Sequence, residues 1–237
     1  MAAGLRVARE TYDIRGVQRS DVLRYLGHNG QEISADLDAR IDTAVARCLS
    51  VARPRGSITS FPIASIDEQS VELAGCTLPL TGADISVHLS DATEVALMAV
   101  TLGADVDREL RRLSLVDAFE QVLFDAAATA VVERAADAAE AHIRAYARDL
   151  GAYTSWRFSP GYGDLPLDIQ PTFLAALDAT RQLGITLTPS NLMVPTKSVT
   201  ALVGIHPTPQ PGQDTPCPGC NLADFCTIRS SGRTCRD

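Results

Sequence analysis

Apolar positions near the start of the chain predict two helices. Through residues 35–52 apolar side chains recur every four positions, which gives a helix one apolar face. Ser34 precedes this run as a capping residue, and Pro54 ends it. A shorter helix is predicted between Ser20, a second capping residue, and Gly27, a residue type that favours helix ends.

The next segments predict strands followed by a long helix. Residues 56–82 are rich in Ile, Val and Thr and are punctuated by Gly and Pro, as is typical of strands joined by tight turns. Residues 83–89 alternate between apolar and polar side chains and predict a further strand. Asp91 is expected to cap a helix over residues 92–103. Residues 105–150 contain neither Pro nor Gly, so we expect them to be almost continuously helical.

The last third of the chain has a different character. Residues 152–166 are aromatic and contain Pro and Gly, which predicts a loop, and residues 171–184 predict a helix. Residues 185–195 and 197–205 are expected to form paired strands, because the second is rich in β-branched and apolar side chains.

These elements together predict an α+β fold, in which long helices pack against a small, mainly antiparallel sheet. The chain divides into a domain over residues 1–206 and a tail over residues 207–237 that is rich in Pro, Gly and Cys. Because the tail has too little apolar surface to fold by packing alone, we expect it to be irregular, and either disordered or held together by its cysteines.

Composition and charge narrow the class of protein. The chain has 237 residues, of which 46% are hydrophobic, and its 21 basic and 29 acidic residues give a net charge of −8. This acidity argues against a nucleic-acid partner, which requires clustered basic side chains. No apolar run approaches the roughly 20 residues of a membrane helix, so no membrane role is expected. The first residues lack the apolar stretch of a secretory signal, which predicts a cytoplasmic protein.

The six cysteines fall into two groups. Cys48 and Cys76 lie in apolar stretches and are expected to be small buried side chains. The other four follow a Cys-x2-Cys-x5-Cys-x8-Cys spacing in the tail: Cys217, Cys220, Cys226 and Cys235. Four thiols at this spacing suit zinc or an iron–sulfur cluster, and a disordered thiol tail is the alternative.

Common catalytic signatures are absent from the sequence, which has no phosphate-binding GxxxxGKS/T loop, no GxGxxG, no HExxH and no GxSxG. The histidines are scattered without the spacing of metal ligands, so we expect surface or half-buried side chains: His28, His88, His142 and His206.

A short loop sequence, RFSPGYG at residues 157–163, is the first candidate binding feature. The Arg157 guanidinium is a planar fork suited to a carboxylate, and a Pro-Gly turn lets the backbone approach a ligand closely. Tyr162 adds a ring face and a hydroxyl, so the loop suits a small zwitterion that contains an amino acid. The alternative is an ordinary turn with a surface arginine.

Glu133 is the second candidate. It continues a series of steps of four, three, four and three residues along the long predicted helix, after Phe119, Leu123, Ala126 and Ala130. A carboxylate on an apolar stripe must be paired, hydrogen-bonded or directed into a cavity, because burying it bare is costly. Glu133 is expected either to hold the ammonium group of a ligand or to form a structural pair with an arginine.

Three sequence segments resemble one family. RFSPGY followed by GDLPL, over residues 157–167, resembles the RxxxGY-type loop of the activation domain of cobalamin-dependent methionine synthase. LTPSNLMVPTKSV, over residues 187–199, is similar to the LTxSxxMxPxxSVS segment of that domain. Residues 20–61 resemble the free-standing version of the domain, a separate polypeptide that serves a shortened methionine synthase. The resemblance covers about residues 18–206.

The resemblance implies a function. Such a domain binds S-adenosylmethionine in a shallow groove and presents its methyl group to a cobalamin that a partner methionine synthase holds, while a one-electron donor protein reduces inactive cob(II)alamin. It implies that Arg157 pairs with the methionine carboxylate, that Glu133 contacts the ligand, and that the remaining contacts come from the loop: Ser159, Pro160, Gly161 and Tyr162.

Methyl transfer to a strongly nucleophilic cobalt needs no general base, so positioning supplies most of the catalysis. Tyr162 is the one residue to which we assign a catalytic part, because its ring can face the sulfonium cation. An iron–sulfur cluster in the cysteine tail would suit a reaction that consumes an electron. Two alternatives use the same fold: a non-catalytic adaptor that docks a corrinoid protein to a redox donor through the tail, and an activator of another corrinoid methyltransferase.

Overall fold

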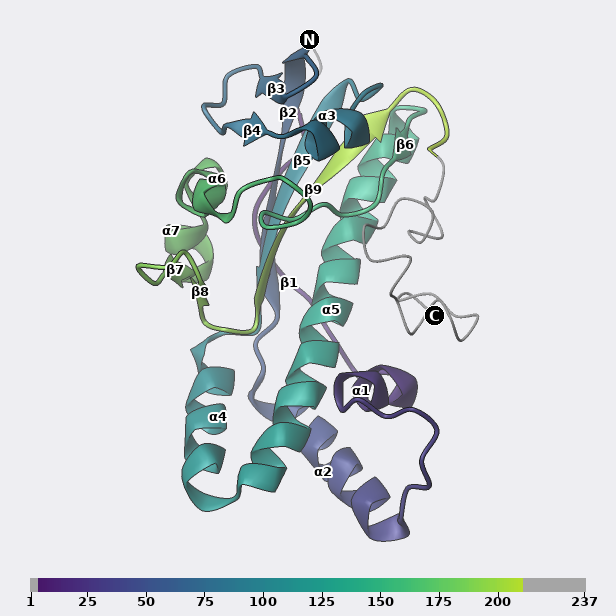
Figure 1. Ribbon diagram of the computed structural model, residues 1–237, viewed down its shortest axis with the longest axis vertical. Helices are drawn as coiled ribbons and strands as arrows, with labels where there is room; N and C mark the ends of the chain where they lie inside the picture. The colour runs from purple at the N-terminus through teal and green to yellow at the C-terminus, as the bar shows by residue number, and fades with distance from the viewer. Residues whose placement is uncertain (1–3, 211–237) are drawn as a thin grey trace.

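The computed structural model describes residues 4–210 (Figure 1). Its main sheet has seven strands, and all of its pairings are antiparallel. The strands run in the order β4-β3-β2-β5-β9-β6, and β1 also pairs with β2. Their bounds are β1 Arg6–Thr11, β2 Arg55–Ile66, β3 Ser70–Leu73, β4 Leu80–Thr81, β5 Glu94–Thr101, β6 Tyr153–Thr154 and β9 Ser198–His206. A separate hairpin joins β7 Thr186–Leu187 to β8 Met193–Val194.

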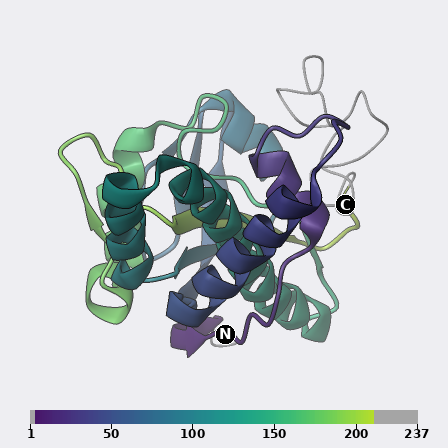
Figure 2. The same cartoon turned by 90° about the horizontal axis from the view of Figure 1, so that it is seen from below.

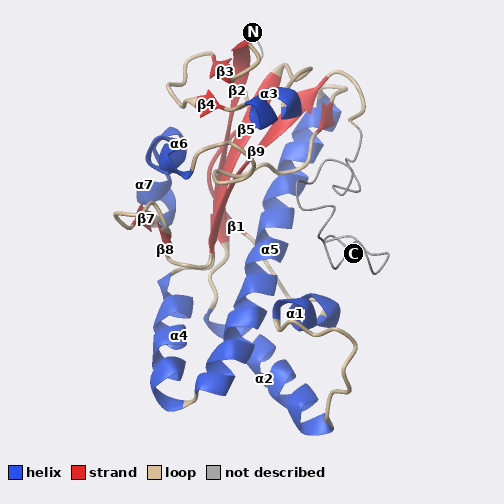
Figure 3. Cartoon of the chain, viewed as in Figure 1, coloured by secondary structure: helices blue, strands red, loops and turns tan. Residues whose placement is uncertain are grey.

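The helices cover both faces of this sheet and extend past one end of it (Figure 3). Their bounds are α1 Arg19–Tyr25, α2 Ala35–Val51, α3 Ala83–His88, α4 Ala104–Val116, α5 Ala118–Asp149, α6 Gln170–Ala176 and α7 Ala179–Leu183, with a short 3-10 turn at Leu167–Ile169. The expected α+β fold with long helices and an antiparallel sheet is therefore confirmed for the described residues.

Two cores lie on the two faces of the sheet. On one face, α5 buries a row of alanine and valine side chains against β5 and β9, where Met98, Val100 and Val203 are fully covered. On the other face, α3, α6 and α7 cover Leu97 and Leu202. Because β5 is buried on both sides, it is the centre of the molecule.

The long helix α5 also supports α1 and α2, as the view from below shows (Figure 2). Leu123, Ala126 and Ala130 of α5 pack against Val22 of α1 and Ile41 of α2. These three α5 residues belong to the apolar series that precedes Glu133, so the first half of the series serves packing between helices.

Two predicted elements are wrong, and they are neighbours. Residues 83–89 form helix α3 rather than a strand, because the carboxylate of Asp164 accepts hydrogen bonds from Ala83 N at 2.6 Å and Asp84 N at 3.1 Å. A cap supplied by such a distant residue leaves no local signal. Residues 92–103 contain strand β5 rather than a helix capped by Asp91, because burial on both faces overrides the helix preference of Ala, Leu and Met.

Smaller corrections concern where elements begin and end. The first helix starts at Arg19 with Gln18 before it, so Ser20 does not cap it, whereas Ser34 Oγ accepts the Leu37 amide as predicted. The helical stretch over residues 105–150 breaks at Asp117, whose carboxylate caps α5. The helix predicted over residues 171–184 breaks at Asp178, which is left-handed at φ 52°.

The strand pairing near the end of the domain also differs from expectation. Residues 185–195 fold on themselves as the β7–β8 hairpin, and β9 instead lies in the main sheet between β5 and β6. The segments predicted as a pair are thus not partners. Within the part of the chain that is described, no helix is long and apolar enough to cross a membrane.

The cysteine predictions are confirmed only in part. Cys48 is fully buried, and burial raises the pKa of its thiol to about 12. Cys76 is half-buried rather than buried. Of the predicted tail over residues 207–237, the structure describes only residues 207–210. The four tail cysteines therefore lie outside the described residues.

Candidate functional site

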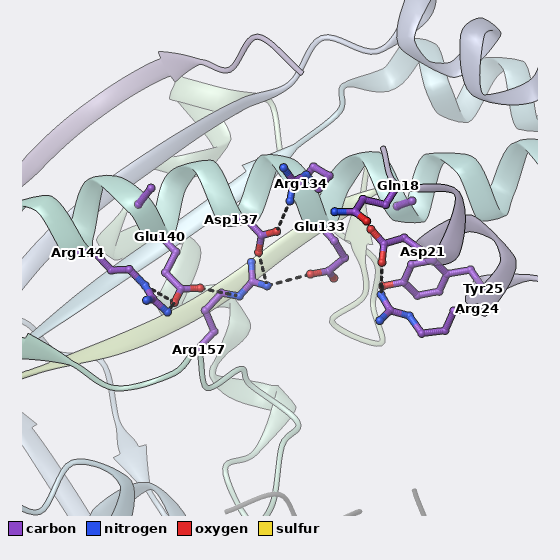
Figure 4. Close-up of a pocket in the computed structure, with 12 residues that line it drawn as sticks. Gln18, Asp21, Arg24, Tyr25, Glu133, Arg134, Asp137, Glu140, Arg144 and Arg157 are labelled. Carbon is purple, nitrogen blue, oxygen red and sulfur yellow. Dashed lines mark hydrogen bonds and ion pairs between the residues drawn. The ribbon is translucent and has the colours of Figure 1, made fainter. Parts of the chain in front are cut away.

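The second half of α5 carries a row of charged side chains on one face. Glu133, Asp137, Glu140 and Arg144 follow one another at steps of four, three and four residues. These steps continue the apolar series that begins at Phe119, so the same stripe of the helix changes from apolar to charged. The charged half faces the loop that follows β6 (Figure 4).

Arg157 on that loop reaches across to three carboxylates of α5. Its Nη2 donates to Glu133 Oε2 and to Asp137 Oδ1, both at 3.1 Å, and its Nε lies 3.4 Å from Glu140 Oε2. The Arg157 side chain is 15% exposed and that of Glu140 only 4%. Arg144 donates to the other Glu140 oxygen at 2.8 Å, which leaves this buried carboxylate fully compensated.

A cavity of about 270 Å³ opens beside these pairs. Its walls come from three parts of the chain: the α1 region, α5 and the loop after β6. The lining residues are Gln18, Asp21, Arg24, Tyr25, Ala130, Glu133, Arg134, Asp137, Glu140, Ala141, Arg144 and Arg157. Four carboxylates and four guanidinium groups surround the space, so it presents both signs of charge to a ligand.

The α1 wall adds the one aromatic ring of this lining. Arg24 lies over the ring of Tyr25 at 5.0 Å and pairs with Asp21 at 3.3 Å. Burial, together with the nearby charge of Glu133, raises the pKa of the Tyr25 hydroxyl, so this hydroxyl stays protonated at neutral pH. Tyr25 therefore offers a flat apolar face and a neutral hydroxyl.

One nitrogen of the Arg157 side chain is not used as a donor within residues 4–210. Among the residues that the structure describes, its Nη1 has no hydrogen-bond partner although the atom is buried. A buried guanidinium nitrogen without a partner costs free energy, because the hydrogen bonds that it made to water in the unfolded chain are not replaced. Arg157 thus carries one buried nitrogen whose hydrogen-bonding capacity is not used by the described residues.

Comparisons with known proteins identify the family. The family described as vitamin B12-dependent methionine synthase, activation domain, matches residues 84–211, which is more than half of the chain and includes α5 and the loop of Arg157. The chain belongs to this family. The solved structure described as the crystal structure of the MetH reactivation domain bound to AdoHcy has a TM-score of 0.66 and 17% sequence identity, and the match covers 98% of this chain and 88% of that one. No curated relative matches the chain.

This activation domain brings two of the predicted binding residues into direct contact. Glu133 and Arg157 both line the cavity, and they form an ion pair with each other. They were expected to hold opposite ends of a ligand. The ion pair matches the second of the two roles expected for Glu133, a structural pair with an arginine. A role in ligand binding requires Glu133 and Arg157 to separate, or to contact the ligand while they remain paired.

The other predicted loop residues are not among those that line the cavity. Ser159 O accepts the Tyr162 amide at 2.9 Å, and Gly161 adopts φ +90°, which a residue with a side chain would resist. The Tyr162 side chain is 59% exposed, and its ring packs edge-on to Phe158 at 6.1 Å. Ser159 to Tyr162 thus form a turn at the surface next to Arg157.

Sequence reasoning missed most of the charged residues of the site. Asp137 and Glu140 continue the four-and-three spacing, so extending the series past Glu133 would have found them. The α1 side chains carried no such signal, because their place opposite α5 depends on how α1 packs. Asp21 and Tyr25 are therefore known only from the structure.

Two of the four histidines differ from expectation, whereas His28 is half-buried and His142 exposed, as predicted. His88 is 8% exposed and His206 is fully buried, so these two are core residues rather than surface or half-buried ones. His88 and His206 are far apart in the sequence, but α3 and β9 bring their rings close enough that the charge of one affects the pKa of the other. No group of three or more His, Cys, Asp or Glu within residues 4–210 is arranged to hold a metal ion.

Proposed function

We propose that this protein binds S-adenosylmethionine in the α1–α5 cavity and supports the reductive methylation of cob(II)alamin on a partner methionine synthase. Membership of the activation-domain family supports this role, and the solved relative of the same fold is described with AdoHcy bound. The observation that carries the proposal for this chain is that Arg157 lines a cavity of about 270 Å³ while its buried Nη1 has no hydrogen-bond partner among residues 4–210.

The methionyl group of the ligand matches the charges of this cavity. Its carboxylate would accept a charge-assisted hydrogen bond from the Arg157 guanidinium, which already lines the cavity. Its ammonium would lie near Glu133 and Asp137, whose side chains are 38% and 45% exposed and therefore free to turn toward it. Glu140, at 4% exposure, would keep Arg157 fixed during this exchange.

The surface turn next to Arg157 is proposed to hold the reacting end of the ligand. Ser159, Pro160 and Gly161 would supply backbone close to the ligand, and the exposed ring of Tyr162 would face the sulfonium, worth about 0.5–2 kcal/mol as a cation–π contact. In the reaction an external electron donor reduces the corrinoid, the methyl carbon moves from sulfur to cobalt, and S-adenosylhomocysteine leaves. Positioning by this chain is the main contribution.

A second proposal concerns the cysteines of the tail. Cys217, Cys220, Cys226 and Cys235 have the spacing of ligands for an iron–sulfur cluster or zinc, and an iron–sulfur cluster would link the protein to its electron donor. Metal analysis and an absorption spectrum of anaerobically purified protein test this part. Iron with acid-labile sulfide indicates a cluster, zinc indicates a structural site, and metal-free protein contradicts both.

Calorimetric titration with S-adenosylhomocysteine tests ligand binding. We expect saturable binding by the wild type and a loss of at least tenfold in Arg157→Gln. The matched control is Arg112→Gln, which removes an arginine that pairs with Glu109 on α4, away from the cavity. Equal affinity in Arg157→Gln and wild type would contradict the assignment of Arg157.

Activity is tested with a corrinoid-loaded partner, S-adenosylmethionine and a low-potential reductant. We expect the absorption of cob(II)alamin to be replaced by that of methylcobalamin only when this protein is present. If the protein binds the partner tightly but neither the methyl donor nor its product, it is an adaptor, and the proposed function is wrong.

A further inference from the structure

The loop that carries Arg157 contains one residue more than the strand beside it. Thr154 pairs with Ile205 and Phe158 pairs with Leu202, so residues 155–157 lie opposite residues 203–204. Backbone hydrogen bonds frame this irregularity on both sides, from Ser155 N to Gly204 O at 3.0 Å and from Phe158 N to Leu202 O at 2.9 Å. The extra residue is a β-bulge.

The bulge decides which face of the sheet receives Arg157. In β9, Val203 and Ile205 belong to the core under α5, whereas Leu202 belongs to the core on the other face. Without an extra residue, position 157 would share the face of position 155, away from α5, because side chains alternate along a strand. With the bulge, Phe158 takes that face and Arg157 points at the carboxylates of α5.

His88 at the end of α3 binds the backbone of the bulge. Its Nε2 donates to the Trp156 carbonyl at 3.1 Å and lies 3.0 Å from Ser155 Oγ, which in turn accepts the Gly204 amide at 2.9 Å. Its ring packs against Trp156 at 4.7 Å and Phe158 at 5.0 Å. A bulge leaves a backbone group without a partner in the ladder, and here a side chain supplies that partner.

The same helix holds the far end of the loop. The carboxylate of Asp164 caps α3 at Ala83 and Asp84, and Gly82 and Gly163 pass so close to the carboxylates of Asp164 and Asp84 that neither position has room for a side chain. Segment 155–164 is thus tied to α3 at both of its ends. A short helix on one face of the sheet determines the position of a binding side chain on the other.

We infer that His88 is a positioning residue of the methyl-donor site, because it holds the bulge at Trp156 that directs the Arg157 guanidinium at α5 and the cavity. The effect of His88 on ligand binding rests on the proposed function, whereas its effect on the loop does not. Burial lowers the pKa of His88 to about 4, with a smaller contribution from His206, so the ring is neutral at pH 7. Because a carbonyl oxygen can only accept, the hydrogen bond to Trp156 requires the tautomer that carries its hydrogen on Nε2.

A pair of substitutions of equal shape separates hydrogen bonding from packing. His88→Gln retains a donor at a similar reach, and His88→Met has almost the same length and no donor. The control is Ile85→Val, which removes a methyl group from another buried side chain of α3 without touching the bulge. Ser155→Ala, which removes the hydroxyl between His88 and Gly204, carries the same test if a His88 variant does not fold.

The first measurement needs no ligand. Trp156 is the single tryptophan of the chain, so acrylamide quenching of its emission reports the bulge alone. We expect at least a twofold rise in the quenching constant for His88→Met and Ser155→Ala, and wild-type values for His88→Gln and Ile85→Val. Unchanged quenching in His88→Met, or an equal rise in Ile85→Val, would overturn the inference.

The second measurement is the affinity for S-adenosylhomocysteine. We expect a loss of at least tenfold in His88→Met, a loss within threefold in His88→Gln, and no loss in Ile85→Val. Equal loss in the Gln and Met variants overturns the role of the hydrogen bond. If the wild type binds no ligand while quenching responds as expected, the proposed function fails and the control of the loop by His88 stands.

Discussion

Two polar clusters lie on opposite sides of the same bulge, and they are built differently. On the α5 side, Arg157 meets carboxylates of which two are more than a third exposed. On the α3 side, His88, Ser155 and His206 are all buried, and within the described residues neither nitrogen of His206 has a hydrogen-bond partner. The first cluster is charged and open to a ligand, whereas the second is neutral and closed.

This difference agrees with the proposed roles of the two clusters, binding for the first and support for the second. The more exposed charged groups, Glu133 and Asp137, keep their water and their mobility on the side where we propose that the ligand binds, because full burial would cost several kcal/mol per ion. Neutral rings and a hydroxyl occupy the buried side, where the loop must be held in one place. The bulge joins the two, since one side of the backbone is held so that the other can present Arg157.

The largest effect is expected where the charged cluster loses its cation. Arg157→Met leaves Glu133 and Asp137 facing each other and Glu140 with Arg144 alone. We expect the free energy of unfolding to fall by about 3 kcal/mol, because a buried ion pair is broken from one side. Urea unfolding at pH 7 measures this, and a loss below about 1 kcal/mol would show that the cluster does not stabilise the fold.

The closed cluster is expected to respond to acid. The pKa of His88 is about 4 in the folded protein against about 6.5 in the unfolded chain, so the unfolded state binds the proton first. The stabilisation from the neutral ring is complete above pH 6.5 and declines as the pH falls toward 4, by at most about 3 kcal/mol. Burial also lowers the pKa of His206, which acts in the same direction.

Urea unfolding of wild type and His88→Gln between pH 4 and 7 measures this contribution. The difference in unfolding free energy between the two proteins removes the shared titration of the carboxylates. We expect that difference to change by roughly 2–3 kcal/mol over this range. A difference that is independent of pH would mean that His88 is charged or exposed in the folded protein.

A smaller effect is expected from adding a methyl group at Gly204, next to His206, where there is no room for it. A methyl group at Gly204 would lie 2.5 Å from His206 Nε2, 2.9 Å from Leu89 Cδ2 and 3.1 Å from Ser155 Oγ. Gly204→Ala should therefore lower the free energy of unfolding by about 1–2 kcal/mol through overpacking. Gly16→Ala, where nothing lies within 4 Å, is the control and should change it by less than about 0.5 kcal/mol.

The smallest effect is expected at the rim of the charged cluster. Arg134 lies 3.7 Å from Asp137, and both side chains are nearly half exposed. Arg134→Ala should change the free energy of unfolding by less than about 0.5 kcal/mol, because water and salt screen such pairs. Thermal unfolding at low and high salt checks this, and a larger loss would place Arg134 inside the cluster.

The sequence predicted the fold best where local rules and tertiary structure agree. Helix α5 could be predicted because its segment contains neither Pro nor Gly, and the start of α2 could be predicted from the capping residue Ser34. The segment of strand β5 was predicted as a helix and that of helix α3 as a strand. Burial on both faces determines β5, and a cap from Asp164 determines α3. Both causes lie outside any local window of sequence.

The candidate site was predictable to a similar extent. Glu133 and Arg157 stood out by residue type and spacing, and the continued spacing could have added Asp137 and Glu140. The bulge was not readable, because it exists only in the register between the loop and β9. The role of His88 follows from that register and was equally hidden.

The central claim is that the Arg157 guanidinium binds the carboxylate of the methyl donor, and a double-mutant cycle on protein and ligand tests it most directly. Calorimetry would compare S-adenosylhomocysteine with its decarboxylated analogue, on wild type and on Arg157→Gln. We predict that removing the ligand carboxylate weakens binding to the wild type at least tenfold and to the variant less than threefold. An equal loss in both proteins would contradict the account.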